Sequence, residues 1–166
     1  MKTFIPNFIT LLNLLSGCIA VIYAVNGDMK LTALFVCLGI LFDFLDGFIA
    51  RKLRVQSVLG VQLDSLADLV TSGVVPGLVL YYLFSLATQL TWDTIGIVPY
   101  FGLLVTLASA YRLAKFNVSD TQSDFFIGLP VPANTLWIIA LPLILEYQSN
   151  DVVQEIILNP WFLVLF

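Results

Sequence analysis

Long apolar stretches, each interrupted by only a few polar side chains, recur along the whole chain. A helix needs about 20 such residues to cross the hydrocarbon core of a bilayer. Five stretches approach or exceed this length, near residues 8–25, 31–51, 58–86, 95–115 and 130–146. A sixth begins near residue 152, and the chain stops before it is complete. The pattern predicts an all-α fold: a polytopic membrane helix bundle with a six-transmembrane-helix core, a truncated last helix and a single domain over residues 1–166.

The composition supports a lipid-embedded chain and excludes several kinds of chemistry. Hydrophobic residues make up 60 % of the chain, charged residues 11 %, and the mean hydropathy is +0.99, whereas soluble domains are about 45–50 % apolar. The chain has no histidine, which excludes Ser-His-Asp catalysis and His-ligated zinc. Cys18 and Cys37 lack metal-ligand spacing, so we expect them to pack in the core. No basic cluster interleaved with aromatic residues is present, and we expect no nucleic-acid partner.

The basic residues divide unequally between the two sides of the predicted bundle. When successive spans alternate in direction, six bases fall on one side: Lys2, Arg51, Lys52, Arg54, Arg112 and Lys115. Lys30 alone falls on the other side. Cytoplasmic loops carry an excess of Lys and Arg. The amino terminus and the loops at 51–57 and 116–129 are therefore predicted to be cytoplasmic.

Four aspartates lie within the second and third apolar stretches. Asp43 and Asp46 are three residues apart, and Asp64 and Asp68 are four apart, so each pair projects from one face of its helix. With a rise of about 1.5 Å per residue, the pairs lie about 6–12 Å from the short loop that joins the two helices. Because the helices run antiparallel from that loop, all four carboxylates are predicted to meet at one depth near the cytoplasm.

Such a cluster needs cations, since each buried carboxylate carries a desolvation penalty of several kcal/mol. Ligands that are all oxygen favour Mg²⁺ or Mn²⁺, and two such ions about 3.5–4 Å apart form a known device for phosphoryl transfer. Gly47 and Gly60 would let a bulky ligand approach the helices closely. The alternative is an ion path in a transporter. That alternative predicts acids spread over the membrane depth and inverted repeats, which the sequence does not show.

The two acidic helices carry one continuous pattern: Asp43-x-x-Asp46-Gly47-x-x-Ala50-Arg51, eight further residues, then Gly60-x-x-x-Asp64-x-x-x-Asp68. It resembles the signature of the CDP-alcohol phosphatidyltransferases at every fixed position. Four flanking blocks resemble the branch of that family that uses serine as acceptor: 7–13, 63–70, 111–117 and 126–133. The resemblance extends over nearly the whole chain. It also implies six transmembrane helices, because members of this family have a core of six such helices.

The resemblance implies an enzyme of phospholipid synthesis in a bacterial or archaeal cell membrane, with its active site at the cytoplasmic face. It would transfer a phosphatidyl group from CDP-diacylglycerol to L-serine, giving phosphatidylserine and CMP, and form a homodimer. The implied metal ligands are the four aspartates of the motif, Asp43, Asp46, Asp64 and Asp68. Asp68 would also be the general base. The same chemistry with glycerol 3-phosphate or inositol phosphate as acceptor stays open.

Two further sets of residues are candidates for substrate binding. Those expected to contact CDP-diacylglycerol are Asn7, Thr10, Asn13, Gly47, Ala50, Arg51 and Gly60. For the three polar residues of the first helix, hydrogen bonding between helices is an equal alternative. Arg112 and Lys115 are expected to hold the serine carboxylate or a phosphate; their alternative is anchoring at the cytoplasmic surface.

Overall fold

The computed structural model describes residues 4–55, 57–91, 96–118, 130–148 and 151–164. All regular secondary structure in its described part is helical. The elements are α1 (Phe4–Val25), α2 (Met29–Leu53), α3 (Val58–Leu69), a π-helical turn η1 (Val70–Val74), α4 (Val75–Thr91), a 3₁₀ segment η2 (Val98–Leu103), α5 (Leu104–Val118), α6 (Val131–Tyr147), α7 (Asp151–Ile157) and α8 (Pro160–Leu163). The predicted all-α class is confirmed.

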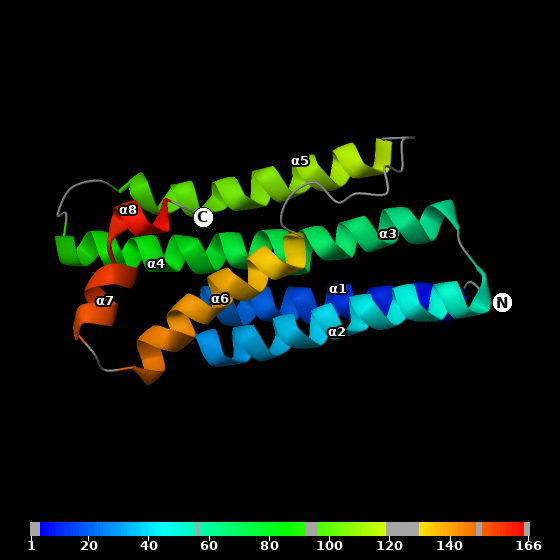
Figure 1. The fold of residues 1–166 in the computed structure, drawn as a ribbon, viewed down its shortest axis with the longest axis horizontal. Coiled ribbons are helices and arrows are strands. Elements are labelled where there is room, and N and C mark those ends of the chain that lie inside the picture. Colours follow the sequence, from blue (N-terminus) through cyan, green and yellow to red (C-terminus); the bar gives the residue numbers. More distant parts are fainter. Residues whose placement is uncertain (1–3, 56, 92–95, 119–129, 149–150, 165–166) are drawn as a thin grey trace.

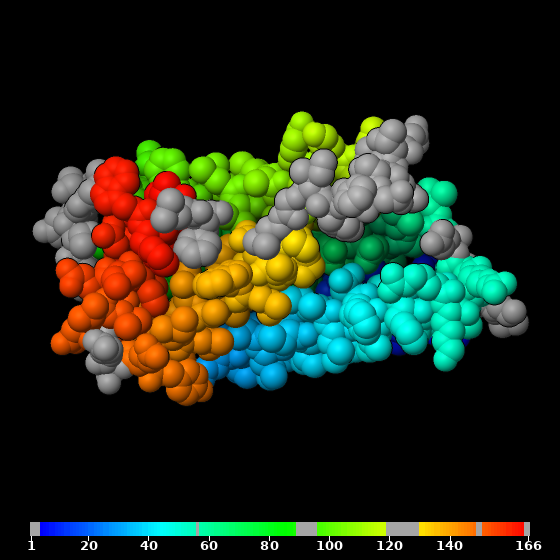
Figure 2. Space-filling view, viewed as in Figure 1, coloured from blue at the N-terminus to red at the C-terminus, as the bar shows by residue number. Residues whose placement is uncertain are grey.

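The helices are arranged as a bundle along one long axis (Figure 1). α1 and α2 form an antiparallel pair, and α3, η1 and α4 together form one long rod beside them. α5 packs on the rod, while α6 crosses the bundle obliquely, and α7 and α8 lie at the end of the bundle remote from the α2–α3 loop (Figure 1). The space-filling view shows α6 over only the half of the bundle remote from that loop (Figure 2). The acidic half of α2 is thus not covered by α6.

Three helices are long and apolar enough to cross a membrane: Phe4–Val25, Met29–Leu53 and the rod Val58–Thr88. α6 is apolar but shorter. Large apolar side chains such as Phe8, Ile22 and Phe44 are exposed on these helices, as expected where lipid is the solvent. The chain is a membrane protein.

Two of the predicted stretches differ from continuous helices. The stretch near 95–115 begins as the 3₁₀ segment η2, and its α-helix starts at Leu104. Gly102 of η2 allows this segment to approach α4 closely, because a Cβ there would lie 2.5 Å from the backbone nitrogen of Tyr81 on α4. The stretch from 152 is divided into α7 and α8 at Asn159, whose side chain accepts a hydrogen bond from the Trp161 backbone N–H at 3.0 Å. Pro160 follows as the first residue of α8, where its missing N–H is tolerated.

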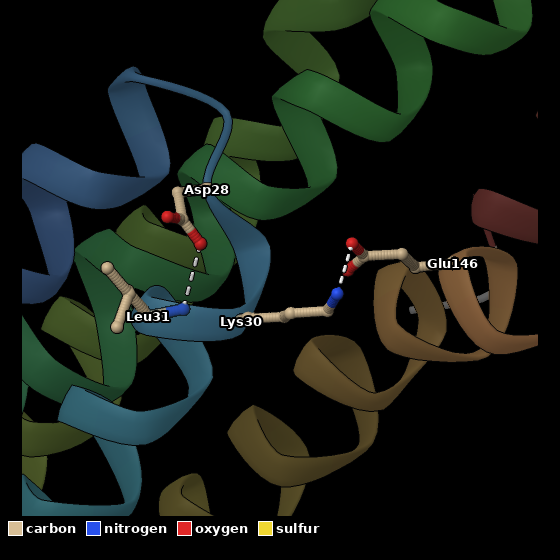
Figure 3. Close-up of polar contacts among 4 residues, drawn as sticks. All are labelled: Asp28, Lys30, Leu31 and Glu146. Atoms are coloured by element: carbon tan, nitrogen blue, oxygen red, sulfur yellow. Dashed lines mark hydrogen bonds and ion pairs between the residues drawn. The ribbon is translucent and has the colours of Figure 1, made fainter.

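Local capping residues fix both ends of α2. At the first end, Asp28 accepts a hydrogen bond from the Leu31 backbone N–H at 3.0 Å (Figure 3). Beside this cap, Lys30 forms an ion pair with Glu146 of α6 at 2.7 Å, which joins the two helices (Figure 3). At the other end Arg54 adopts a left-handed conformation with φ 52° and ends the helix. Ser57 then caps α3 by accepting from the Gly60 backbone N–H at 3.0 Å. This tight connection makes α2 and α3 antiparallel, as predicted.

The buried core lies mainly between α4 and the helices around it. Its largest fully buried apolar side chains are Leu80, Leu83, Phe84, Ile138 and Leu163. The expectation that Cys18 and Cys37 pack in this core is wrong, because both are exposed. Their helices turn these positions outward, while Gly17 and Gly39 face the interior.

Candidate metal centre

Three carboxylates meet between α2 and α3. Each of Asp43, Asp64 and Asp68 offers one oxygen, and these oxygens lie within 4.8 Å of one another. Their meeting follows from the sequence spacing: Asp64 and Asp68 share a face of α3, and the short α2–α3 connection brings Asp43 to their level. The structure therefore brings together three of the four aspartates predicted to bind metal.

The ligand atoms fit a hard divalent cation. Asp64 Oδ1 is buried and has no hydrogen-bond partner among the described residues. A buried carboxylate oxygen without a partner is unfavourable, and a cation held by neighbouring carboxylates would satisfy it. Groups that offer only oxygen suit Mg²⁺ or Mn²⁺ rather than a metal that prefers nitrogen or sulfur.

Asp46 has a different environment from the other three aspartates. It is 6 % exposed, and its Oδ2 accepts a hydrogen bond from the hydroxyl of Thr10 on α1. The group of three close carboxylates does not include it. Its role as a metal ligand therefore stays a prediction, and Thr10 is a neighbour of the acidic cluster.

Asn13 lies on α1, the helix that carries Thr10, and it also contacts the acidic cluster. Its Nδ2 donates to Asp68 Oδ1 over a long 3.4 Å, and its Oδ1 accepts from the Thr71 hydroxyl at 2.9 Å. Asn7 lies beside Gly60, where an added Cβ would be 3.1 Å from Asn7 Oδ1. For Thr10 and Asn13 the structure thus shows hydrogen bonds between helices. Thr71 is absent from the predicted site, although its spacing of three from Asp68 places both on one helical face.

The remaining residues of the motif lie beside the cluster on α2. Gly47 is open: the nearest atom to an added Cβ is Arg51 Nη2, at 4.0 Å. Arg51 is exposed, and Ala50 is half-buried. This part of α2 has room for a ligand against the helix backbone.

The C-terminal end of α5 lies against α3 at Ser65. Asn117 Nδ2 donates to the Ser65 hydroxyl at 2.9 Å, a contact that the sequence did not predict. This end of α5 also carries Arg112, which is half-buried, and Lys115, which is exposed. Their proposed contact with an acceptor stays a prediction.

A carboxylate cluster that holds two divalent cations is a known device of enzymes that act on phosphate groups. The family model for CDP-alcohol phosphatidyltransferase matches residues 3–166. The chain belongs to this family, which is a phosphotransferase family that depends on divalent metals.

Curated relatives agree with this assignment. A CDP-diacylglycerol–serine O-phosphatidyltransferase of Bacillus subtilis is 35 % identical over 153 residues, covering 92 % of this chain and 81 % of the relative. The protein of the same name from Methanocaldococcus jannaschii is 32 % identical over 154 residues, covering 92 % and 68 %. An archaetidylserine synthase of Methanothermobacter thermautotrophicus is 32 % identical over 130 residues, covering 77 % of this chain and 53 % of the relative. The chain thus spans about half the length of this archaetidylserine synthase.

Proposed function

We propose that this protein transfers a phosphatidyl group from CDP-diacylglycerol to the hydroxyl of L-serine, giving phosphatidylserine and CMP. The observation that carries the proposal is the group of three carboxylates, Asp43, Asp64 and Asp68, on the motif of a family that makes this kind of transfer. Serine is favoured as the acceptor because the relatives reported above are named as serine transferases or archaetidylserine synthase.

Two divalent cations, Mg²⁺ or Mn²⁺, would be held by these three aspartates, with Asp46 as the fourth ligand. When bound, they would offset the negative charge that develops on the transferred phosphoryl group and on the departing CMP. Asp43 and Asp64 approach from facing helices. A ligand set built on two helices requires that α2 and α3 keep their relative position, and α1 supports this by packing against both.

Asp68 would act as the general base. As the serine oxygen forms its bond to the phosphorus that carries the diacylglycerol, the bond from that phosphorus to the CMP phosphate oxygen breaks. The serine hydroxyl proton passes to the Asp68 carboxylate. A carboxylate is an adequate base for a hydroxyl only when proton transfer accompanies bond formation. Asp68 must therefore be oriented at the attacking oxygen, not merely near it.

The donor would bind along α2 with its nucleotide at the loop end and its acyl chains in lipid. The open face at Gly47 and the exposed Arg51 support this placement. Arg112 and Lys115 of α5 would receive the serine carboxylate. The protein would be a multi-pass enzyme with a six-helix core in a bacterial or archaeal cell membrane. Its active site would lie at the cytoplasmic face, and two copies would form a homodimer.

The test is release of CMP by the purified protein from CDP-diacylglycerol and Mn²⁺ with separate acceptors. We expect release with L-serine and not with glycerol 3-phosphate or inositol phosphate; the reverse result would refute serine as the acceptor. Asp68→Asn should still bind the donor and lose nearly all turnover. Asp151→Asn, the same change in α7 outside the cluster, should keep full activity. An active Asp68→Asn enzyme would remove the general-base assignment.

A further inference from the structure

The rod that carries Asp64 and Asp68 changes its helical geometry directly after them. The turn η1 (Val70–Val74) is π-helical, and such turns occur frequently at functional sites. Two of its carbonyl groups accept hydrogen bonds from other helices: Ser72 from Thr135 of α6 at 3.0 Å, and Gly73 from Thr106 of α5 at 2.9 Å. Figure 1 shows α6 and α5 meeting the rod in this region. Packing on several sides therefore holds the wide turn.

Thr71 of this turn is enclosed by glycines of two other helices. It is 1 % exposed. A Cβ added to Gly39 of α2 would lie 2.7 Å from Thr71 Cγ2, and one added to Gly17 of α1 would overlap with Thr71 Oγ1. Only glycine at both positions leaves room for this side chain. The Thr71 hydroxyl is consequently fixed in place at the junction of α1, α2 and the rod.

The Asp68 carboxylate and the fixed Thr71 hydroxyl bind opposite ends of the Asn13 amide. Asn13 is fully buried, and it lies between Thr71 and Asp68, at 2.9 Å and 3.4 Å. An ionised carboxylate is only an acceptor, so the amide N–H must face Asp68. The amide oxygen then faces Thr71, whose hydroxyl donates to it. The opposite orientation would set the amide oxygen against the carboxylate.

We propose that Asn13 is a positioning residue that aims the Asp68 carboxylate, and that Thr71, from the π-helical turn, holds the Asn13 amide in place by donating to its oxygen. This role differs from the contact with CDP-diacylglycerol that the sequence suggested for Asn13. Its effect on turnover rests on the proposed function. Its effect on cation binding does not, because Asp68 belongs to the carboxylate group whether or not serine is the acceptor.

The test compares Thr71 with Thr135, which is bonded to the same π-helical turn, in the purified protein. Thr71→Val removes the hydroxyl that holds Asn13, whereas Thr135→Val removes a hydroxyl that is bonded to the same turn and does not contact Asn13. A neutral hydrogen bond contributes about 0.5–1.5 kcal/mol, which corresponds to about a two- to tenfold change. We expect Thr71→Val to weaken Mn²⁺ binding, measured by calorimetry, by about this factor. It should lower kcat similarly, with KM for CDP-diacylglycerol unchanged.

Thr71→Ser keeps the hydroxyl and should restore Mn²⁺ affinity and kcat, while Thr135→Val should match wild type in both. Thr71→Ala removes the hydroxyl together with the methyl group and places no methyl group at the hydroxyl position, and it replaces the valine variant if that does not fold. Equal effects of Thr71→Val and Thr135→Val on Mn²⁺ affinity would overturn the proposal. So would an Asn13→Ala protein whose only defect is a raised KM for the donor. Wild-type protein without serine-dependent CMP release would refute the proposed acceptor instead, and the Mn²⁺ comparison would still decide the role of Thr71.

Discussion

Gly39 on α2 offers a quantitative test of the packing around the site. A Cβ at this position would lie 2.7 Å from Thr71 Cγ2 and 3.0 Å from Asn13 Oδ1. Carbon atoms in contact prefer about 3.5–4.0 Å, so Gly39→Ala creates an overlap of about 1 Å. Thr71 has little room to move, because α1 packs against it at Gly17. The helix backbone of α2 must move instead.

Two opposing terms set the size of the effect. Replacing glycine by alanine inside a helix favours the folded state by about 1 kcal/mol. Overpacking a well-packed interior by a methyl group costs about 1–3 kcal/mol, and the upper part of that range applies because Asn13 and Thr71 are both buried. We expect a net loss of about 1–2 kcal/mol in the free energy of unfolding. A displacement of α2 also moves Asp43 relative to Asp68, so Mn²⁺ affinity should fall with stability.

Gly47→Ala is the matched control on the same helix. There an added Cβ finds its nearest neighbour, Arg51 Nη2, at 4.0 Å, so no overlap opposes the gain in helix propensity. Its melting temperature should equal or exceed that of wild type, while CMP release should fall because the methyl group occupies space proposed for the donor. Thermal unfolding in detergent, followed by circular dichroism, measures the first quantity. A Gly39→Ala protein as stable as Gly47→Ala would refute the packing argument, and a fully active Gly47→Ala protein would refute the donor placement.

Three further changes test the site and its surroundings. Asp64→Asn should raise the melting temperature of metal-free protein, because a buried unsatisfied group costs about 1–3 kcal/mol and the amide can donate to neighbouring carboxylates. It should also abolish the rise in melting temperature that Mn²⁺ produces in the wild-type protein. An unchanged Mn²⁺-dependent rise would contradict the assignment of Asp64 as a metal ligand. Arg54→Gly should stabilise the fold by about 1 kcal/mol, since left-handed backbone is unfavourable for other residues; a lower melting temperature would contradict this. Lys30→Ala should leave Mn²⁺ affinity and CMP release unchanged, because Lys30 lies about 20 Å along α2 from Asp43.

The position of the acidic cluster could be predicted from the sequence because it depends on local rules. The spacing of Asp64 and Asp68 fixes their shared face, and a connection too short for any other arrangement makes α2 and α3 antiparallel. Neither argument needs knowledge of distant contacts. The meeting of Asp43 with these two residues at one level was predicted for this reason, and the structure confirms it.

The features that sequence reasoning missed depend on contacts between distant segments. The spacing from Asp68 indicates a shared helical face for Thr71, but its place in the site depends on glycines of α1 and α2 that leave space for it, and no local periodicity marks a π-helical turn. Asp46 was grouped with the other aspartates by spacing, yet a hydroxyl of α1 engages it. Cys18 and Cys37 are a further case in which the sequence did not predict the environment of a residue. Their apolar setting suggested the core, although in a membrane protein an apolar residue is equally suited to the lipid-facing surface.

The division of polar contacts within the cluster gives α1 a role beyond helix packing. Thr10 and Asn13 each supply a hydrogen bond to one carboxylate, Asp46 and Asp68, whereas Asp64 Oδ1 receives none from the described residues. Neutral donors lower the desolvation penalty of a carboxylate without neutralising its charge. α1 therefore orients the acids that it contacts and leaves the charge to be balanced by cations. A helix that supplied Lys or Arg instead would compete with the proposed cations for the same carboxylates.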